Sequence, residues 1–124
     1  EKAMDDFAVV MDRIPKIVFS HTLQELDWDS AALAGKTPEA VVRELKEQPG
    51  GDILVGSRSI MMHLLNLGLI DELQLCVHPV IAAGGLPLFE QVQSRITLKL
   101  LHTKTFASGA LICYYAPHRK DNGA

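Results

Sequence analysis

The sequence has little of several features that mark particular protein classes. Its 124 residues include two cysteines, and aromatic residues make up only 6%. Twelve lysines and arginines stand against fifteen acidic residues, for a net charge of −3. This balance provides no basic surface for nucleic acid or for an anionic membrane. A chain of this length can nevertheless bury a core without disulfides or structural metal.

Long hydrophobic runs are also missing. No apolar stretch approaches the roughly 18 residues that span a bilayer, and the acidic start of the chain does not have the pattern of a signal peptide. We therefore expect a cytoplasmic protein with no membrane partner. The first residue is Glu1 rather than Met, in what has the pattern of a helix, so we expect the sequence to be part of a longer chain.

The cysteines and histidines do not suggest a metal site. Cys76 and Cys113 both lie in apolar stretches of β-strand character, where an unpaired cysteine is usually buried. We expect two free, buried thiols rather than a redox pair. The five histidines show neither the H-x-x-x-H pattern nor Cys/His ligand spacing, so we expect no metal.

The first half of the chain alternates helical and strand-like patterns. Its helical segments have apolar residues three and four positions apart, and short apolar runs between them indicate buried strands. Thr37, Pro38 and Glu39 begin a helix as N-cap, first-turn proline and first-turn acid. This order of elements predicts a βαβ unit with parallel strands. The expected elements are a helix at 4–14, a strand at 16–20, a loop at 22–36, a helix from 38, a strand at 52–55 and a helix through 60–65 that Gly68 ends.

The second half has mainly β-strand character. Apolar and polar residues alternate over 73–78, which predicts a half-buried strand. Two further β-rich runs, 96–106 and 110–115, are joined by three residues that end in Gly109, a typical hairpin connection. We therefore predict one α/β domain over 1–124, with a mixed sheet flanked by helices and an antiparallel C-terminal hairpin.

The junction after the predicted strand 52–55 is the strongest candidate site. Free backbone N–H groups and the positive end of the helix dipole meet there, and Gly56 lets a ligand approach the main chain. Ser57, Arg58 and Ser59 add donors for phosphate oxygens. The signal is weak, because one glycine is neither a G-x-G-x-x-G motif nor a P-loop. A serine that acts only as a helix N-cap is the alternative.

A second candidate follows the first predicted strand. If the two strands are parallel, their carboxyl ends share one sheet edge, where open α/β sheets bind ligands. Ser20, His21 and Thr22 would then face the phosphate site. The alternative is that the two hydroxyls cap the loop and the imidazole is solvated.

A third candidate is the Gly84-Gly85 turn with Phe89 behind it, a possible pocket wall or simply a cover for the core. No G-x-S-x-G elbow is present, which excludes the usual serine-hydrolase pattern. No acid/base pair stands out, so catalytic residues are left unassigned.

Five ordered segments together resemble the C-terminal reductase domain of the bacterial riboflavin-biosynthesis deaminase/reductase and its stand-alone relatives, which have the dihydrofolate reductase-like fold. The likeness runs from about Pro15 to Tyr115, and the ordered set is more specific than any one motif. The segments are KIVFSHTL (16–23), LKEQPGGDILVGS (45–57), LLNLGLIDEL (64–73), PVIAAGGLPLF (79–89) and FASG (106–109).

The resemblance implies an NADPH-dependent reductase. Hydride transfer would convert the ribosyl group of a 5-amino-6-(5-phosphoribosylamino)uracil-like substrate to ribityl, and the protein would form a homodimer. The cofactor would supply the hydride and the protein the binding and orientation. The implied cofactor-binding residues are Ser20, His21 and Thr22 beside the adenosine ribose and its 2′-phosphate, and Val55, Gly56, Ser57, Arg58 and Ser59 around the pyrophosphate.

Two departures from the family pattern matter. Family members begin with a strand, a loop and a helix that this sequence lacks, and that part carries much of the substrate and nicotinamide contacts. His21 stands where a longer basic residue commonly follows the serine, and an uncharged imidazole would hold a 2′-phosphate less firmly. Two alternatives stay open: a dihydrofolate reductase-like enzyme with another substrate, and a non-catalytic dimerisation module built on the hairpin 96–115.

Overall fold

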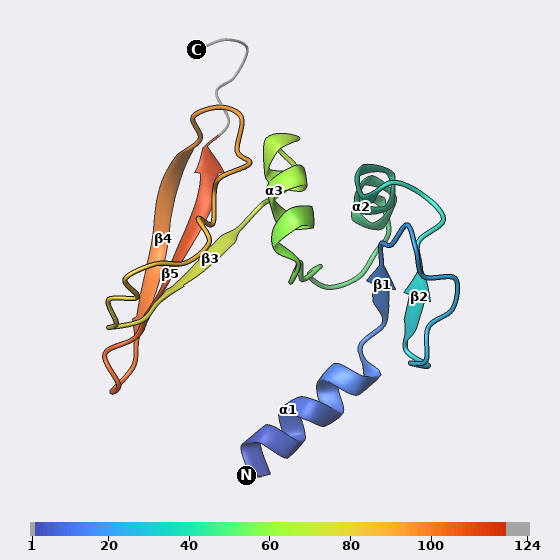
Figure 1. Cartoon of the computed structure of the whole chain (residues 1–124), viewed down its shortest axis with the longest axis horizontal. Coiled ribbons are helices and arrows are strands. Elements are labelled where there is room, and N and C mark those ends of the chain that lie inside the picture. Colours follow the sequence, from blue (N-terminus) through green and yellow to red (C-terminus); the bar gives the residue numbers. More distant parts are fainter. Residues whose placement is uncertain (1, 119–124) are drawn as a thin grey trace. The chain divides into compact units, whose positions relative to one another are not determined.

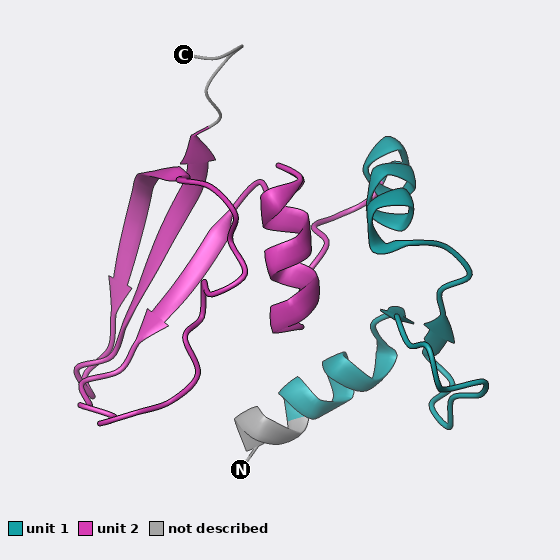
Figure 2. Ribbon diagram, turned by 45° about the horizontal axis from the view of Figure 1, so that its top comes forward, with its two compact units in different colours: residues 1–49 teal, residues 50–124 magenta. Residues whose placement is uncertain are grey.

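The computed structural model describes residues 2–118, with side chains from Asp6 onward. Two compact units divide the chain, residues 1–49 and residues 50–124 (Figure 2). The elements, labelled in Figure 1, are α1 (Lys2–Arg13), β1 (Lys16–Val18), β2 (Ala31–Leu33), α2 (Pro38–Glu47), α3 (Arg58–Asn66), β3 (Leu73–Val77), β4 (Thr97–Thr105) and β5 (Leu111–His118).

The first unit holds the parallel strand pair. Strand β1 pairs with β2 in the register Lys16↔Ala31 to Val18↔Leu33. The predicted helix at the start of the chain is confirmed as α1, although the side chain of Met4, part of its predicted apolar stripe, lies outside the described side chains. The prediction of a loop over 22–36 is wrong at Ala31–Leu33, because these residues form strand β2. Three residues are too short a run to show a period of two, so only pairing with β1 makes them a strand.

Helix α2 begins as the sequence predicts. The Thr37 backbone is extended, and its Oγ1 accepts a hydrogen bond from the Ala40 N–H at 3.3 Å. Glu39 forms an i,i+4 ion pair with Arg43 at 3.0 Å on the exposed side. Val42 on the opposite side is buried. Local capping and amphipathic spacing therefore suffice to define this helix.

The predicted strand at 52–55 is not formed. Residues 52–55 have no strand partner within the described part of the chain, and the Leu54 side chain is 82% exposed. A strand needs a neighbour to satisfy its backbone N–H and C=O groups, and apolar composition alone does not provide one. The predicted βαβ unit is therefore also wrong, because the parallel pair is β1 with β2, both before α2.

Helix α3 supplies most of the core of the second unit. Met62, Leu64 and Leu65 are buried on it. The helix ends as predicted at Gly68, whose φ is +70°. The Gly68 N–H donates to the Leu65 carbonyl at 3.1 Å and the Leu69 N–H to the Leu64 carbonyl at 2.9 Å. This pair of bonds is a Schellman motif, which satisfies carbonyls at the helix end.

The three C-terminal strands form an antiparallel sheet in the order β3-β5-β4, and α3 lies alongside it in both views (Figures 1 and 2). The predicted hairpin is confirmed: Gly109 turns the chain between β4 and β5 with a φ of +93°. The predicted α/β class with parallel and antiparallel strands is thus confirmed, with the two kinds of pairing in separate sheets.

The two cysteines are free, as predicted, but they are not both buried. Cys113 on β5 is partly buried, whereas Cys76 on β3 is exposed. Among the described residues, β3 pairs with β5 alone, so it is an edge strand of its sheet. Successive side chains of a strand point to opposite faces. Leu73 and Leu75 are buried or partly buried on one face, and Cys76 lies exposed on the other, which is why the prediction of a buried Cys76 is wrong.

Candidate functional site

The start of α3 is an open helix N-terminus. Ser57 is the N-cap residue, and its carbonyl oxygen accepts the Met61 N–H at 2.8 Å. Its side chain does not cap the helix; instead Ser57 Oγ lies 3.2 Å from Ser59 Oγ. No acidic residue occupies the first turn. The first-turn N–H groups therefore have no side-chain acceptor from the cap, and the two hydroxyls lie beside them.

Gly56 leaves space in front of this helix end. A Cβ built on Gly56 would meet no atom within 4 Å in the described structure, and its backbone φ is not in the left-handed region. Its neighbour Val55 is partly buried, whereas Gly56, Ser57 and Ser59 are exposed. An anion can thus approach the main chain here, and the helix dipole favours negative charge at this end.

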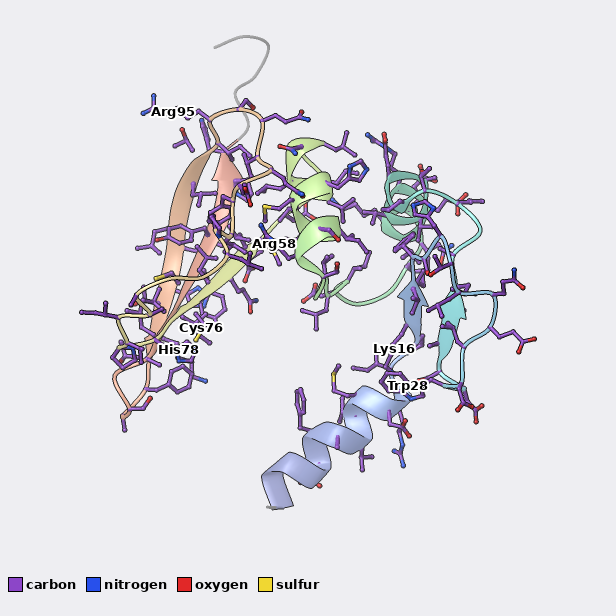
Figure 3. The ribbon with its side chains drawn as sticks, in the orientation of Figure 1. Lys16, Trp28, Arg58, Cys76, His78 and Arg95 are labelled. Atoms are coloured by element: carbon purple, nitrogen blue, oxygen red, sulfur yellow. The ribbon has the colours of Figure 1, made fainter. Side chains whose placement is uncertain are left out.

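Arg58, a predicted phosphate ligand, is engaged with a loop (Figure 3). Its Nη2 donates to the carbonyl oxygen of Pro87 at 2.7 Å and lies 3.4 Å from Oε2 of Glu90. Its Nε is buried and has no hydrogen-bond partner among the described residues. The guanidinium therefore joins the first turn of α3 to the loop that contains the predicted pocket wall.

The same loop is tied to the last turn of α3. Asn66 Nδ2 donates to the Gln91 carbonyl at 2.9 Å, and Asn66 Oδ1 accepts the Gln93 N–H at 3.0 Å. The nitrogen and the oxygen of the Asn66 side-chain amide thus both form hydrogen bonds with the backbone of residues 91–93. The connection between β3 and β4 is therefore held at two points on one helix.

The Gly-Gly turn lies in this loop. Ala83 has a φ of +59° and Gly85 a φ of +145°, so the chain reverses sharply beside Gly84. Phe89 is 41% exposed, so it does not serve simply as a core cover. Residues 79–91 are exposed throughout. A pocket wall made by Gly84, Gly85 and Phe89 stays a prediction.

Ser20, His21 and Thr22 lie after β1. Ser20 Oγ accepts the N–H groups of Thr22 at 3.2 Å and Leu23 at 3.1 Å, so it caps its own loop, and the His21 side chain is exposed. These three residues belong to the first unit, whereas the start of α3 belongs to the second. Their expected meeting at one ligand stays a prediction.

Two features were not found from the sequence. Lys16 Nζ lies 3.9 Å from the centre of the Trp28 ring and donates a hydrogen bond to Ser30 Oγ at 2.7 Å. Both partners belong to the predicted loop 22–36. No local pattern signals this pairing. In the second unit, a pocket of about 220 Å³ lies between the end of α3, the start of β4 and the end of β5. Its lining residues are Leu65, Asn66, Gly68, Ile70, Ser94, Arg95, Ile96, Thr97, Pro117 and His118.

Among the described residues, no three His, Cys, Asp or Glu side chains gather where they could hold a metal ion. No helix in that part of the chain has the length and apolar character needed to cross a bilayer.

Comparison with known proteins places the chain in a family. The family described as the RibD C-terminal domain matches residues 2–112, and the chain belongs to it. The uncharacterized protein YyaP of Bacillus subtilis is 43% identical over 101 residues, which cover 81% of this chain and 53% of that protein. The uncharacterized protein YwjB of the same organism is 29% identical over 76 residues, or 60% of this chain and 44% of that one. The chain thus spans about half the length of these relatives.

Solved structures share the fold. A putative riboflavin biosynthesis protein from Shewanella sp. PV-4 superimposes with a TM-score of 0.74 at 18% identity, over 94% of this chain and 71% of that one. A pyrimidine reductase-like protein from Corynebacterium diphtheriae gives a TM-score of 0.57 at 20% identity, over 84% of this chain and 50% of that one. The predicted resemblance to the riboflavin-type reductase domain, and its fold, are confirmed.

Proposed function

We propose that this chain is part of an NADPH-dependent reductase that transfers hydride to the ribosyl group of a 5-amino-6-(5-phosphoribosylamino)uracil-like pyrimidine. Membership of the RibD C-terminal domain family over residues 2–112 supports this reading. The fold is also that of a pyrimidine reductase-like protein. The cofactor, when bound, supplies the hydride, and the protein binds and orients it and its substrate.

The observation that carries the cofactor assignment is the open start of α3. Gly56 leaves free space, and the first turn has no acid and no side-chain cap. A bound pyrophosphate would accept the free N–H groups of the helix and bonds from Ser57 and Ser59. These residues fit an anionic cofactor in charge and in space.

Ser20 can serve the same cofactor while it caps its loop. Its Oγ accepts two backbone N–H groups, which uses the two lone pairs of a hydroxyl. Its own hydrogen can donate to Oγ1 of Thr22 at 3.4 Å or, when the cofactor is bound, to a ribose or phosphate oxygen. We assign His21 and Thr22 to the same adenosine end, where an exposed imidazole and hydroxyl can contact a 2′-phosphate.

NADPH binding tests this function, and Gly56 provides matched variants. Gly56→Ala adds a methyl group that meets no protein atom within 4 Å but narrows the space in which the anion approaches the main chain, so it should weaken NADPH binding without lowering stability. Gly56→Asp places a carboxylate at the phosphate position and should abolish the NADPH-induced rise in melting temperature. Gly56→Asn controls for size without charge. An unchanged rise in the aspartate variant would refute the site. Parallel titrations with NADH measure what the 2′-phosphate contributes.

We further propose that the protein acts as a cytoplasmic homodimer. Strand β4 pairs only with β5 among the described strands, and Leu100 and Leu101 on it are exposed. An exposed apolar edge strand is a surface on which a second copy can pair. Light scattering of the purified chain measures the mass directly. A dimer that binds no NADPH would instead favour the non-catalytic module.

A further inference from the structure

The loop between β3 and β4 is held to α3 at two chemically different points. At the far end of the helix, Asn66 makes two neutral hydrogen bonds to the backbone at Gln91 and Gln93. At the near end, the cation of Arg58 holds the Pro87 carbonyl. Only the second contact lies in the first turn of α3, where the proposed phosphate site is.

The Arg58 guanidinium has N–H donors that make no hydrogen bond in the described structure. It carries five N–H groups, yet Nη2 alone makes both of its contacts, to Pro87 and to Glu90. Its Nε is buried without a partner in the described structure. A buried, unpaired donor is costly, and a cation in a first turn faces the like-signed end of the helix dipole. The Arg58 side chain as a whole is 37% exposed, so an anion can reach the exposed part of the guanidinium and offset the second of these costs.

We propose that Arg58 is a positioning residue that couples anion binding at the start of α3 to the position of the loop around Gly84 and Pro87. Nη2 of the guanidinium holds the Pro87 carbonyl, and the N–H groups of Nη1 hold the phosphate. A planar guanidinium can bind two acceptors at once, whereas an ammonium acts as a single charge. This inference rests on the proposed function for the identity of the anion.

Glu90 competes with the anion for Arg58. Its carboxylate lies 3.4 Å from Nη2 and is 63% exposed, and exposed ion pairs of this kind are weak. A phosphate group makes shorter, charge-assisted bonds and would displace it. Glu90 therefore lowers anion affinity, and its removal should raise that affinity.

Solution NMR on the full chain tests the coupling, with amide order parameters at Gly84 and Gly85 and the Nε–H resonance of Arg58 as readouts. NADPH and, separately, inorganic pyrophosphate serve as probes. In the wild type, either anion should shift the Arg58 resonance and raise the order of the two glycines. Arg58→Lys keeps the positive charge but loses the planar guanidinium that can bind two acceptors at once. It should bind about tenfold more weakly and show no ordering of the loop.

Two further variants separate the coupling from a structural effect. Glu90→Gln should bind the anions about two- to fivefold more tightly. Asn66→Ala loosens the loop at its other attachment without touching the cation, so it should lower loop order while affinity stays within about twofold of the wild type. Equal affinity and equal loop ordering in the wild type and Arg58→Lys would overturn the proposal.

The two anions distinguish this inference from the function on which it rests. If the wild type binds pyrophosphate with loop ordering but does not bind NADPH, the cofactor assignment is wrong and the coupling stands. If NADPH binds while the loop glycines and the Arg58 resonance do not respond, the function stands and the coupling is wrong. If neither anion perturbs Arg58, the coupling is refuted.

Discussion

The indole Nε1–H of Trp28 donates to Oδ1 of Asp12 at 2.6 Å, while Lys16 lies over the same ring. One aromatic side chain thus joins the end of α1 to the loop before β2. Trp28 is the only tryptophan in the chain, and it is 44% exposed. Its role in the first unit is to fix this loop, so its removal should lower stability.

Trp28→Phe keeps an aromatic ring under Lys16 and loses the bond to Asp12. We expect it to lower the free energy of unfolding by about 1 kcal/mol. Trp28→Ala also loses the cation–π contact, which adds about 0.5–1 kcal/mol at an exposed site. Urea denaturation followed by circular dichroism measures both, and equal stability of the two variants would show that the cation–π contact contributes nothing.

Thr37→Ala removes the side-chain cap of α2, whose Oγ1 accepts the Ala40 N–H. The free energy of unfolding should fall by about 1 kcal/mol. Thr37→Ser retains a capping hydroxyl and should lose much less. The same denaturation assay compares them. A serine variant as unstable as the alanine variant would show that the hydrogen bond is not the source of the effect.

Gly109→Ala should destabilise the C-terminal hairpin for two reasons. The position has a φ of +93°, and a new Cβ would lie 3.3 Å from Cγ of Pro79. A residue with a side chain in this conformation costs about 1–3 kcal/mol. Gly35→Ala is the control, because its Cβ would meet nothing within 4 Å and its φ is not positive. Comparable melting temperatures for the two variants would show that an alanine side chain causes no strain at position 109.

The Tyr115 hydroxyl should lose its proton at a higher pH than an ordinary tyrosine, because its pKa is raised. A side-chain hydrogen bond with Cys113 raises the pKa of Tyr115 above the ordinary value of 10.0, and the charge of that thiol and partial burial raise it further. Since the folded-state pKa is the higher one, the associated stabilisation is complete below the unfolded-state pKa. It is lost as the pH rises through the folded-state pKa. The effect is therefore confined to alkaline solution.

Cys113→Ala should lower the pKa of Tyr115 towards 10.0. Absorbance of tyrosinate measures the titration, and Tyr114→Phe leaves Tyr115 as the only tyrosine, since the chain has two. An unchanged Tyr115 titration in the Cys113→Ala background would show that the thiol is not the cause.

Much of the local structure follows from the sequence because its causes lie within a few residues. The cap at Thr37, the reversal at Gly68 and the turn at Gly109 each use hydrogen bonds or dihedral angles set by near neighbours. The family follows from the order of several motifs, and the match over residues 2–112 confirms it. The open start of α3 is likewise visible as a glycine and serines before an apolar helical pattern.

Only the tertiary structure decided which groups that lie far apart along the chain become partners. Whether 52–55 or 31–33 becomes a strand depends on a neighbour for its backbone, and only β2 has one. Arg58 looks like a phosphate ligand in the sequence, but its contact with Pro87 spans 29 positions. No local period or capping rule encodes such a contact, because it exists only once packing has brought the loop to α3.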